Sequence, residues 1–527
     1  MPINAWSIEH VRSAEAATMA TLPDGELMQR AARGLAHVVA ARLRDIEAPR
    51  VVVLAGPGGN GGDALFAAAF LADGSVSVAD AEDAADADAA DSDGTVSVAA
   101  VLLTSNSHAP ALAAARAAGV VLHEARSDSD DEAVQRALAA VSEADVVVDG
   151  ITGIGGRPGL AEGFPVAWRL VQAIPDDAYV MAVDLPSGTD PAGERTVSDC
   201  VFADETVTFG VCKPVHVLAG GPACGLLTVV DIGLDDPGEP VAARLEHDDV
   251  ADLWPVPGPA DDKYTRGVLG IVAGGDRYTG AAVLSVTAAV SAGAGMVRYV
   301  GPSAATDLVR ASVPEAVHGV GRVQAWLVGS GLEALEDGDQ GEEQRAQLDA
   351  ARAALDSAEP CVVDAGGLDL LDGPRPHAGA RTLLTPHAGE LARLLSRLEG
   401  ADVDAVDAEA VRAAPIEHAR RAATALHATV LLKGSTTYVV PPVDALPVYA
   451  QADGPAWLGT AGSGDVLAGL AGTLLAGGLD PLRAGALAAL VHGLAGHEAN
   501  PGGPVRALDV AHAIPRVVAH TLRRAQR

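Results

Sequence analysis

The sequence predicts an α/β protein built from two doubly wound units that follow one another along the chain. Three observations lead to this prediction. The chain has 527 residues, and at roughly 100–200 residues per domain it is long enough for several hydrophobic cores. Short runs of Val, Ile and Leu are continuous, as in parallel strands that are covered on both faces. Ala-rich segments of helix length separate those runs.

The first half opens with a helical segment around Ser13–Arg44 and then alternates strands with helices. Helices are expected at Leu65–Ala72 and Pro110–Ala118. Residues 74–94 interrupt the pattern with Asp and Glu in a run of Ala and Ser. Their spacing is irregular for cation binding, so we expect a solvated, disordered insertion. The expected strands are Arg50–Ala55, Val98–Thr104, Ala144–Asp149, Ala178–Asp184, Glu205–Phe209 and Leu226–Ile232.

A Pro- and Asp-rich stretch, residues 235–262, marks the expected domain boundary. We therefore expect a first domain at 1–235, a linker at 236–260 and a second domain at 261–527. The chain closes with Ala-rich helices at Asp465–Ala476 and Leu482–Ala499. Strands of the second domain are expected at Leu269–Ala273, Met296–Val300, Ala325–Val328, Pro360–Asp364 and Thr429–Leu432.

Composition excludes several classes of protein. With 36 Lys and Arg against 70 Asp and Glu, the formal charge is −34, which does not suit a nucleic-acid binder. No apolar run approaches the roughly 20 residues that span a bilayer, and no signal peptide opens the chain. We therefore expect a cytoplasmic protein without membrane or nucleic-acid partners. Four Cys residues lack metal-ligand spacing.

Only three of the basic residues are lysines: Lys213, Lys263 and Lys433. A GC-rich genome explains Arg in place of Lys but not the excess of acids. An acidic, lysine-poor surface suits a salt-rich cytoplasm, where salt screens self-repulsion. We therefore expect a halophilic, haloarchaeal source. Each lysine lies beside a motif, so we also expect the three to mark where the chemistry is.

Polar residues follow three expected strands of the first half. Gly56–Asp63 is a glycine-rich turn between a strand and a helix, where backbone N–H groups can approach a phosphate. Asp149 and Asp184 each end a strand, and Ser187 follows the second. Such an Asp is also a common helix N-cap. Because the carboxyl ends of parallel strands share one edge, these oxygens could instead hold a hard monovalent or divalent cation.

These residues, with Thr208–Gly210, Lys213-Pro214 and the opening Leu27–Ala32, resemble the NAD(P)H-hydrate epimerase domain. The resemblance implies a Rossmann-like three-layer fold and a K⁺ ion held by Asn60, Asp149 and Ser187. Asp184 is the candidate that moves a proton during epimerisation at C6 of the hydrated ring, by C–O cleavage or ring opening. The implied substrate-binding residues are Gly59, Asn60, Gly61, Gly62, Asp63, Gly153, Ile154, Gly155, Gly156, Arg157 and Asp184.

Thr460–Asp465 forms the corresponding feature of the second half. Gly462 and Gly464 free backbone N–H groups at the start of a helix, which can stabilise a transferring phosphoryl group. Asp465 in the first turn could accept a proton from an attacking hydroxyl, although an Asp there also caps helices. The constellation resembles the ribokinase-like phosphotransferases. Further motifs are Tyr278–Ala282, Ala292–Met296, Val328–Leu332, Thr385–Glu390 and Leu431–Thr437.

Together these motifs resemble the ADP-dependent NAD(P)H-hydrate dehydratase domain, with Asp465 as the catalytic base. The resemblance implies Mg²⁺ on the phosphates and ADP as phosphoryl donor. The chain departs from the family at Ser330 and Glu333, and at Gly366, where an Asp is usual. The implied hydrate-binding residues are Ala281, Gly331, His387 and Asp465. The implied ADP- and AMP-binding residues are Lys433, Gly434, Ser435, Thr436, Thr437 and Gly464.

The order of the two domains resembles the bifunctional nicotinamide nucleotide repair enzymes. The expected substrates are the hydrates of NADH and NADPH (NADHX and NADPHX) together with ADP, and a homo-oligomer is expected. One alternative is a small-molecule kinase fused to a nucleotide-sensing domain, which leaves Lys213 and the Asn60, Asp149 and Ser187 set unexplained. A second alternative is a non-catalytic first half, against which the retention of both Asp149 and Asp184 counts.

Overall fold

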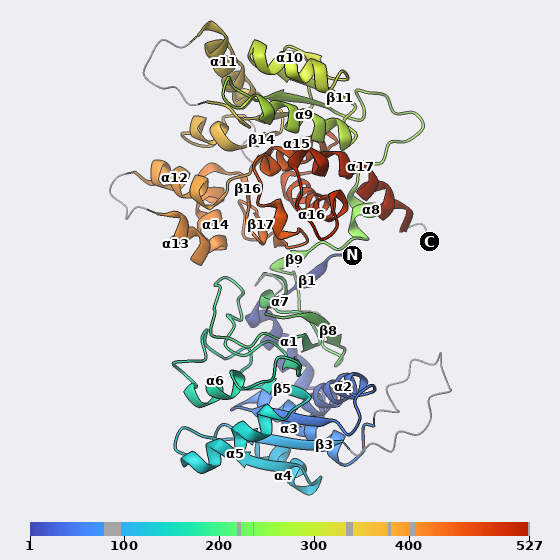
Figure 1. The fold of residues 1–527 in the computed structure, drawn as a ribbon, viewed down its shortest axis with the longest axis vertical. Coiled ribbons are helices and arrows are strands. Elements are labelled where there is room, and N and C mark those ends of the chain that lie inside the picture. The colour runs from blue at the N-terminus through green and yellow to red at the C-terminus, as the bar shows by residue number, and fades with distance from the viewer. Residues whose placement is uncertain are drawn as a thin grey trace. The chain divides into compact units, whose positions relative to one another are not determined.

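The chain folds into two α/β units, Asn4–Val241 and Ala242–Arg527, the second of which also takes in Met1–Ile3 (Figure 1). The computed structural model describes residues 1–77, 96–218, 223–235, 237–333, 341–377, 381–400 and 406–524. The expected acidic insertion at 74–94 therefore lies largely outside the described residues. Each unit is taken by itself below.

The sheet of the N-terminal unit has the order β4-β3-β2-β5-β6-β7-β8, and every adjacent pair is parallel. All of its carboxyl ends therefore lie at one edge. The short strand β1 (Ile3–Ala5) is not part of this sheet. The elements of the unit are α1 (Ile8–Met19), α2 (Glu26–Arg42), β2 (Arg50–Ala55), α3 (Gly59–Ala72), β3 (Ser97–Leu102), α4 (Ala109–Ala117), β4 (Val121–Glu124), α5 (Asp131–Ser142), β5 (Val146–Gly150), α6 (Pro165–Val171), β6 (Tyr179–Val183), β7 (Glu205–Phe209), α7 (Pro214–Leu218) and β8 (Leu226–Val230).

Helices cover both faces of this sheet, which is why the central strand β2 is apolar on both sides. Val51 and Val53 of β2 belong to the cluster with α2, α3 and α4. Val52 and Leu54, which alternate with them, pack instead with α5 and α6. Burying one such side chain contributes about 1.5–3 kcal/mol, so a strand that is apolar on both sides is held firmly in a three-layer unit.

The sheet of the C-terminal unit runs β9-β18-β17-β16-β15-β14-β13-β10-β11-β12 and is parallel except at β16-β17 and β17-β18. Its elements are β9 (Ala242–Arg244), α8 (Asp249–Leu253), β10 (Val268–Val272), α9 (Thr279–Ser291), β11 (Met296–Val300), α10 (Ser303–Ser312), β12 (Val317–His318), β13 (Ala325–Val328), α11 (Glu342–Asp356), β14 (Cys361–Val363), a 3₁₀ helix (Ala365–Leu370), β15 (Thr382–Leu384), α12 (Ala388–Glu399), α13 (Ala408–Ala413), α14 (Pro415–Leu426), β16 (Thr429–Leu432), β17 (Thr437–Val440), β18 (Val448–Gln451), a 3₁₀ helix (Ala456–Leu458), α15 (Ser463–Ala476), α16 (Pro481–Ala499) and α17 (Ala507–Arg524).

The main core of this unit lies between the sheet and helices α9, α15, α16 and α17. Small residues let α15 approach α9 closely. A Cβ on Gly469 would lie 2.3 Å from the carbonyl oxygen of Ser285, so only glycine fits at that crossing. The Ala- and Gly-rich composition of α15 thus follows from packing as well as from its role near the site.

The predicted class, doubly wound α/β, is confirmed in both units, while several local expectations differ. The opening helix is broken at Leu22–Gly25, because Pro23 disfavours a continuous helix and Gly25 adopts φ +79° before α2. The expected linker 236–260 contains β9 and α8 from Ala242 onward, since β9 pairs with β18. The four Cys are buried and free, and no described helix is long and apolar enough to cross a membrane.

Arg375 is a buried cation that holds the end of α11. Its side chain is 5% exposed and donates hydrogen bonds to the carbonyl oxygens of Leu355 at 2.7 Å and of Ser357 and Glu359 at 3.0 Å. We expect Arg375→Ala to lower the free energy of unfolding of the C-terminal unit by about 3 kcal/mol, because buried carbonyls lose charged donors. Urea unfolding measures this. Arg381→Ala, at an exposed arginine with one carbonyl partner, should change it by less than about 0.5 kcal/mol; equal effects would contradict the assignment.

Candidate active sites

Three side chains from separate segments, the end of β5, the first turn of α3 and the loop after β6, meet at the carboxyl edge of the N-terminal sheet. The Ser187 hydroxyl donates to Asp149 Oδ1 at 2.6 Å, and the Ser187 N–H donates to Oδ2 at 2.8 Å. Asn60, in the first turn of α3, donates to the carbonyl oxygens of Val183 at 2.5 Å and Thr152 at 3.3 Å. The structure therefore brings together the three residues that the sequence analysis nominated for a cation.

Asp149 is the negative centre of this group. It is 1% exposed, and its partners are the donors from Ser187 and the N–H of Ile151. Among the described residues no Lys, Arg or His forms an ion pair with it. Burial raises the pKa of Asp149 to about 6, since a buried carboxylate without a counter-charge is costly. This carboxylate, surrounded by hydroxyl, amide and carbonyl oxygens, fits a hard monovalent cation. No described cluster of three or more His, Cys, Asp or Glu residues suits a tighter metal site.

The glycines of the two loops allow this convergence. A Cβ on Gly56 would lie 1.8 Å from the carbonyl oxygen of Ile151, and one on Gly153 would lie 2.2 Å from Asn60 Oδ1. Side chains at either position would drive the loops apart. The remaining predicted binding residues differ in exposure: Gly61, Gly62 and Asp63 are buried, Ile154 and Gly156 are intermediate, and Gly59, Gly155 and Arg157 are exposed.

Asp184 follows β6 and forms a buried ion pair. Lys213 Nζ lies 2.5 Å from Asp184 Oδ1 and is 1% exposed, and Thr208 donates to the same oxygen at 3.0 Å. Although burial opposes ionisation, the Lys213 charge lowers the pKa of Asp184. Asp184 also has φ +66°, a conformation that non-glycine residues rarely adopt and that clusters at functional sites. His216 Nε2 lies 2.7 Å from its carbonyl oxygen.

Sequence reasoning did not assign a role to two further residues of this site. Lys213 lies in a quoted motif but was not named as a site residue, although its rarity was a signal. Glu15 of α1 lies close enough for Asp184 and Lys213 to affect its titration, and burial raises the pKa of Glu15. Nothing in the helical pattern around Glu15 identified it.

The second site lies where β14 and β16 end and α15 begins. Gly462 has φ +89° at the N-cap of α15, and Asp465 lies in the first turn. Burial and the nearby Asp364 raise the pKa of Asp465 to about 7, which Lys433 and Ser330 oppose. A carboxyl group poised near neutral pH can take up or release a proton there.

Lys433 is the cation of the second site. Its Nζ lies 2.9 Å from Asp364 Oδ1 and 3.7 Å from Glu390 Oε2. Burial works against the charge, but Asp364 and Glu390 raise the pKa of Lys433 and keep it protonated. A Cβ on Gly464 would lie 3.3 Å from Lys433 Nζ, so the lysine reaches the start of α15. Lys433 is therefore placed to meet an anion bound at that helix N-terminus.

The other predicted residues of this site fall into three groups. Gly331 and Ala281 adjoin, because a Cβ on Gly331 would lie 2.7 Å from that of Ala281. His387 caps α12 by accepting from the N–H groups of Gly389 and Glu390, and its backbone forms an isolated β-bridge with that of Lys433. Its ring is half-exposed. Gly434, Ser435 and Thr436 form the turn between β16 and β17, and Thr437 begins β17.

Asp364 is the residue that sequence reasoning missed here. It is 2% exposed and accepts hydrogen bonds from Ser330 and Thr385 besides its ion pair with Lys433. Its position at the end of an expected strand was an available signal. Gly366, a departure from the resembled family, has a local reason, since a Cβ there would lie 2.1 Å from the Leu332 carbonyl oxygen.

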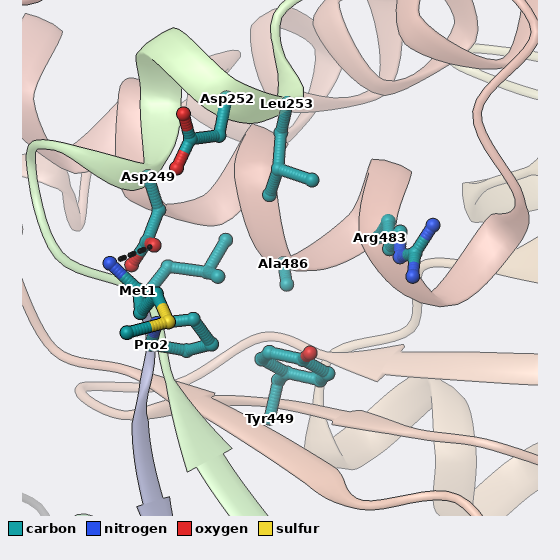
Figure 2. A pocket seen from close by; sticks show the side chains of 9 residues that line it. Met1, Pro2, Asp249, Asp252, Leu253, Tyr449, Arg483 and Ala486 are labelled. Carbon is teal, nitrogen blue, oxygen red and sulfur yellow. Dashed lines mark ion pairs between the residues drawn. The ribbon is translucent and has the colours of Figure 1, made fainter.

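A small pocket of about 170 Å³ lies elsewhere in the C-terminal unit (Figure 2). In Figure 2 Asp249 pairs with the Met1 ammonium at 3.0 Å, while Tyr449 and Arg483 line the other side. It contains none of the predicted site residues. The third lysine, Lys263, is exposed and lies over the Tyr264 ring. Lys213 and Lys433, in contrast, form ion pairs with buried Asp residues at the two candidate sites.

Two family models match the chain, one to each unit. A model described as "YjeF-related protein N-terminus" matches residues 24–215. A model described as "NAD(P)H-hydrate dehydratase" matches residues 269–516.

Relatives match over nearly the whole chain. The bifunctional NAD(P)H-hydrate repair enzyme Nnr of Mycobacterium tuberculosis is 42% identical over 489 residues, covering 90% of this chain and 89% of that protein. The Nnr of Mycobacterium leprae is 40% identical and covers 98% of both. A solved structure of the ADP/ATP-dependent NAD(P)H-hydrate dehydratase from Bacillus subtilis, co-crystallised with ATP and Mg²⁺, covers 53% of this chain and 99% of its own, with 24% identity and a TM-score of 0.45.

Proposed function

The chain belongs to the family of bifunctional NAD(P)H-hydrate repair enzymes, and from this premise we propose how its two units share the work. The Rossmann-like N-terminal unit interconverts the R and S epimers of NADHX and NADPHX. The ribokinase-like C-terminal unit dehydrates the S epimer to NADH or NADPH with ADP, releasing AMP and phosphate. The assignment of one activity to each unit is supported by one observation: each unit has its own site at the strand ends, with a buried Asp–Lys pair.

In the C-terminal site, Asp465 accepts the proton of the C6 hydroxyl as its oxygen attacks the β-phosphorus of ADP. The P–O bond to AMP breaks, and the N–H groups after Gly462 with Lys433 stabilise the transferring charge. The C6–O bond then breaks, phosphate leaves, and loss of a C5 proton restores the dihydropyridine ring. Mg²⁺ would neutralise the phosphates of the bound nucleotide, while Lys433 pairs with Asp364 and Glu390.

In the N-terminal site, Asn60, Asp149 and Ser187 would hold K⁺, whose charge would compensate the buried Asp149 carboxylate. We expect replacement of K⁺ by choline at constant ionic strength to lower the melting temperature of the N-terminal unit and its epimerisation rate. Constant ionic strength matters because general screening of the −34 charge would otherwise mimic the effect. Calorimetry and an epimerisation assay measure both. Asp149→Asn should lose the K⁺ dependence; an unchanged K⁺ dependence in that variant would contradict the site.

The function is tested by incubating the protein with mixed hydrate epimers and ADP or ATP while following the absorbance of NADH. We expect complete conversion of both epimers with ADP. Conversion of the S epimer alone would remove the epimerase half of the proposal. Phosphorylation of another small alcohol without use of the hydrates would favour the small-molecule kinase instead.

Two finer proposals concern the adaptation of the protein to salt and its assembly. We infer that the −34 charge is an adaptation to a salt-rich cytoplasm, as in a haloarchaeal source, and that stability rises with KCl into the molar range. We also infer a homo-oligomer without nucleic-acid or membrane partners, which analytical ultracentrifugation measures.

A further inference from the structure

We propose that Asp63, a buried carboxyl group with an unpartnered oxygen, is the proton donor of the epimerisation. The inference rests on the epimerase activity proposed above and adds the residue that supplies the proton. It assigns different tasks to two carboxyl groups of one site.

The position of Asp63 comes from the contact between α3 and β6. Asp63 lies about one helical turn after Asn60, and the Asn60 amide is hydrogen-bonded to the carbonyl oxygen of Val183 at 2.5 Å. The next residue along the chain is Asp184. This bond holds the first turn of α3 against the end of β6, and the Asp63 carboxyl group lies close enough to Asp184 for that charge to shift its pKa.

One oxygen of the Asp63 carboxyl group is buried without a hydrogen-bond partner, which is unusual. The residue is 8% exposed, and the unpartnered oxygen is Oδ1. Buried polar groups are nearly always hydrogen-bonded, so an orphaned one at a site calls for a functional explanation. A C6 hydroxyl of the bound hydrate would supply the missing partner.

The charges around Asp63 favour its protonated form. Three titratable groups lie near enough to affect Asp63: Asp184 after β6, Glu15 of α1 and Lys213 after β7. Arg12 lies near Glu15, and His216 of α7 is neutral. Burial, Asp184 and Glu15 raise the pKa of Asp63 well above its usual value. Lys213 opposes this but is paired with Asp184.

The two carboxyl groups of the site therefore have pKa values shifted in opposite directions, Asp63 upward and Asp184 downward. Such pairs identify an acid and an ionised partner in an active site. Asp184 cannot readily supply a proton, because its ion pair keeps it ionised.

In the proposed epimerisation, water is lost from C6 and added again. The Asp63 proton moves to the C6 hydroxyl oxygen, the C6–O bond breaks, and water leaves while the N1 lone pair forms a C6=N1 double bond. Asp184 stabilises the positive charge that develops on the ring. Water then adds to the opposite face of C6, the C6=N1 electrons return to N1, and the water proton returns to the Asp63 carboxylate.

The test compares Asp63→Asn with wild type in the conversion of the R epimer, corrected for the uncatalysed rate. We expect the catalysed rate to fall about 10²–10⁴-fold. Asp45→Asn, at an exposed carboxylate of the same unit, should leave it unchanged. A wild-type rate in Asp63→Asn would overturn the inference, whereas a wild type that cannot use the R epimer would instead overturn the proposed epimerase function.

Two further measurements separate catalysis from folding. The unpaired carboxyl destabilises the fold increasingly as pH rises above the unfolded-state pKa of about 4, so Asn at this position should not lower the melting temperature at neutral pH. In wild type the epimerisation rate should decline as pH rises through the raised pKa of Asp63, where this carboxyl group loses its proton. The absence of that decline would also overturn the inference, even if Asp63→Asn failed to fold.

Discussion

Asp465→Asn is expected to reduce the ADP-dependent conversion of the S hydrate by about 10²–10⁴-fold while the epimers still interconvert. The amide keeps the shape of the side chain in the first turn of α15 but cannot accept the hydroxyl proton. Single-turnover assays of NADH formation measure the first effect, and chromatography of the two epimers measures the second. Asp349→Asn, at an exposed position on α11, is the matched control. Loss of both activities in Asp465→Asn would contradict separate sites.

The pH profile gives this prediction a second signature. Asp465 must be ionised to act as a base, and its pKa of about 7 means that the dehydration rate rises as pH rises through 7. Asp364 is the nearby charge that helps to hold this pKa up. In Asp364→Asn the midpoint should therefore move to lower pH. A midpoint that stays in place would remove Asp465 as the titrating base.

Asp184→Asn is expected to abolish use of the R epimer, with a loss of about 10²–10⁴-fold, and to leave S-hydrate conversion intact. Asn tolerates the φ of +66° at this position better than most residues, so the backbone should be retained. Stability should nevertheless fall by about 3–5 kcal/mol, because Lys213 is left as an uncompensated buried charge. Calorimetry of the N-terminal transition measures that loss.

The double variant Asp184→Asn/Lys213→Met separates the two consequences. Methionine fills the volume of the lysine without its charge, so most of the lost stability should return. Use of the R epimer should not return, because the carboxylate is still absent. Recovery of R-epimer turnover together with stability would show that Asp184 has only a structural role.

The sequence was most informative where parallel strands end. Asn60, Asp149 and Ser187 lie in three separate segments, and the rule that strand ends share an edge was enough to place them together. The glycine-rich turns were informative for the same reason, since Gly56 and Gly153 are required by the close approach of those loops. A close approach of two backbone segments can be recognised in the sequence because it requires glycine.

Contacts between distant side chains were harder to predict. Glu15 reaches its site from α1, and its helical surroundings carry no mark of that contact. Asp364 occupies a strand end that was recognised, but its pairing with Lys433 depends on how β14 and β16 are arranged across β15. The C-terminal helix α17 was not expected, although its apolar face completes the main core. Pairing and packing of this kind depend on the assembled sheet.

The distribution of the lysines determines how the protein can be labelled. Lys213 is buried in an ion pair, and Lys433 is largely buried between two carboxylates, whereas Lys263 lies on the surface. An amine-directed fluorophore at moderate pH should therefore attach at Lys263, besides the α-amino group, and leave both lysines of the candidate active sites unmodified. A single reactive lysine on a chain of 527 residues would give a defined side-chain reporter for solution optical measurements without any engineered cysteine.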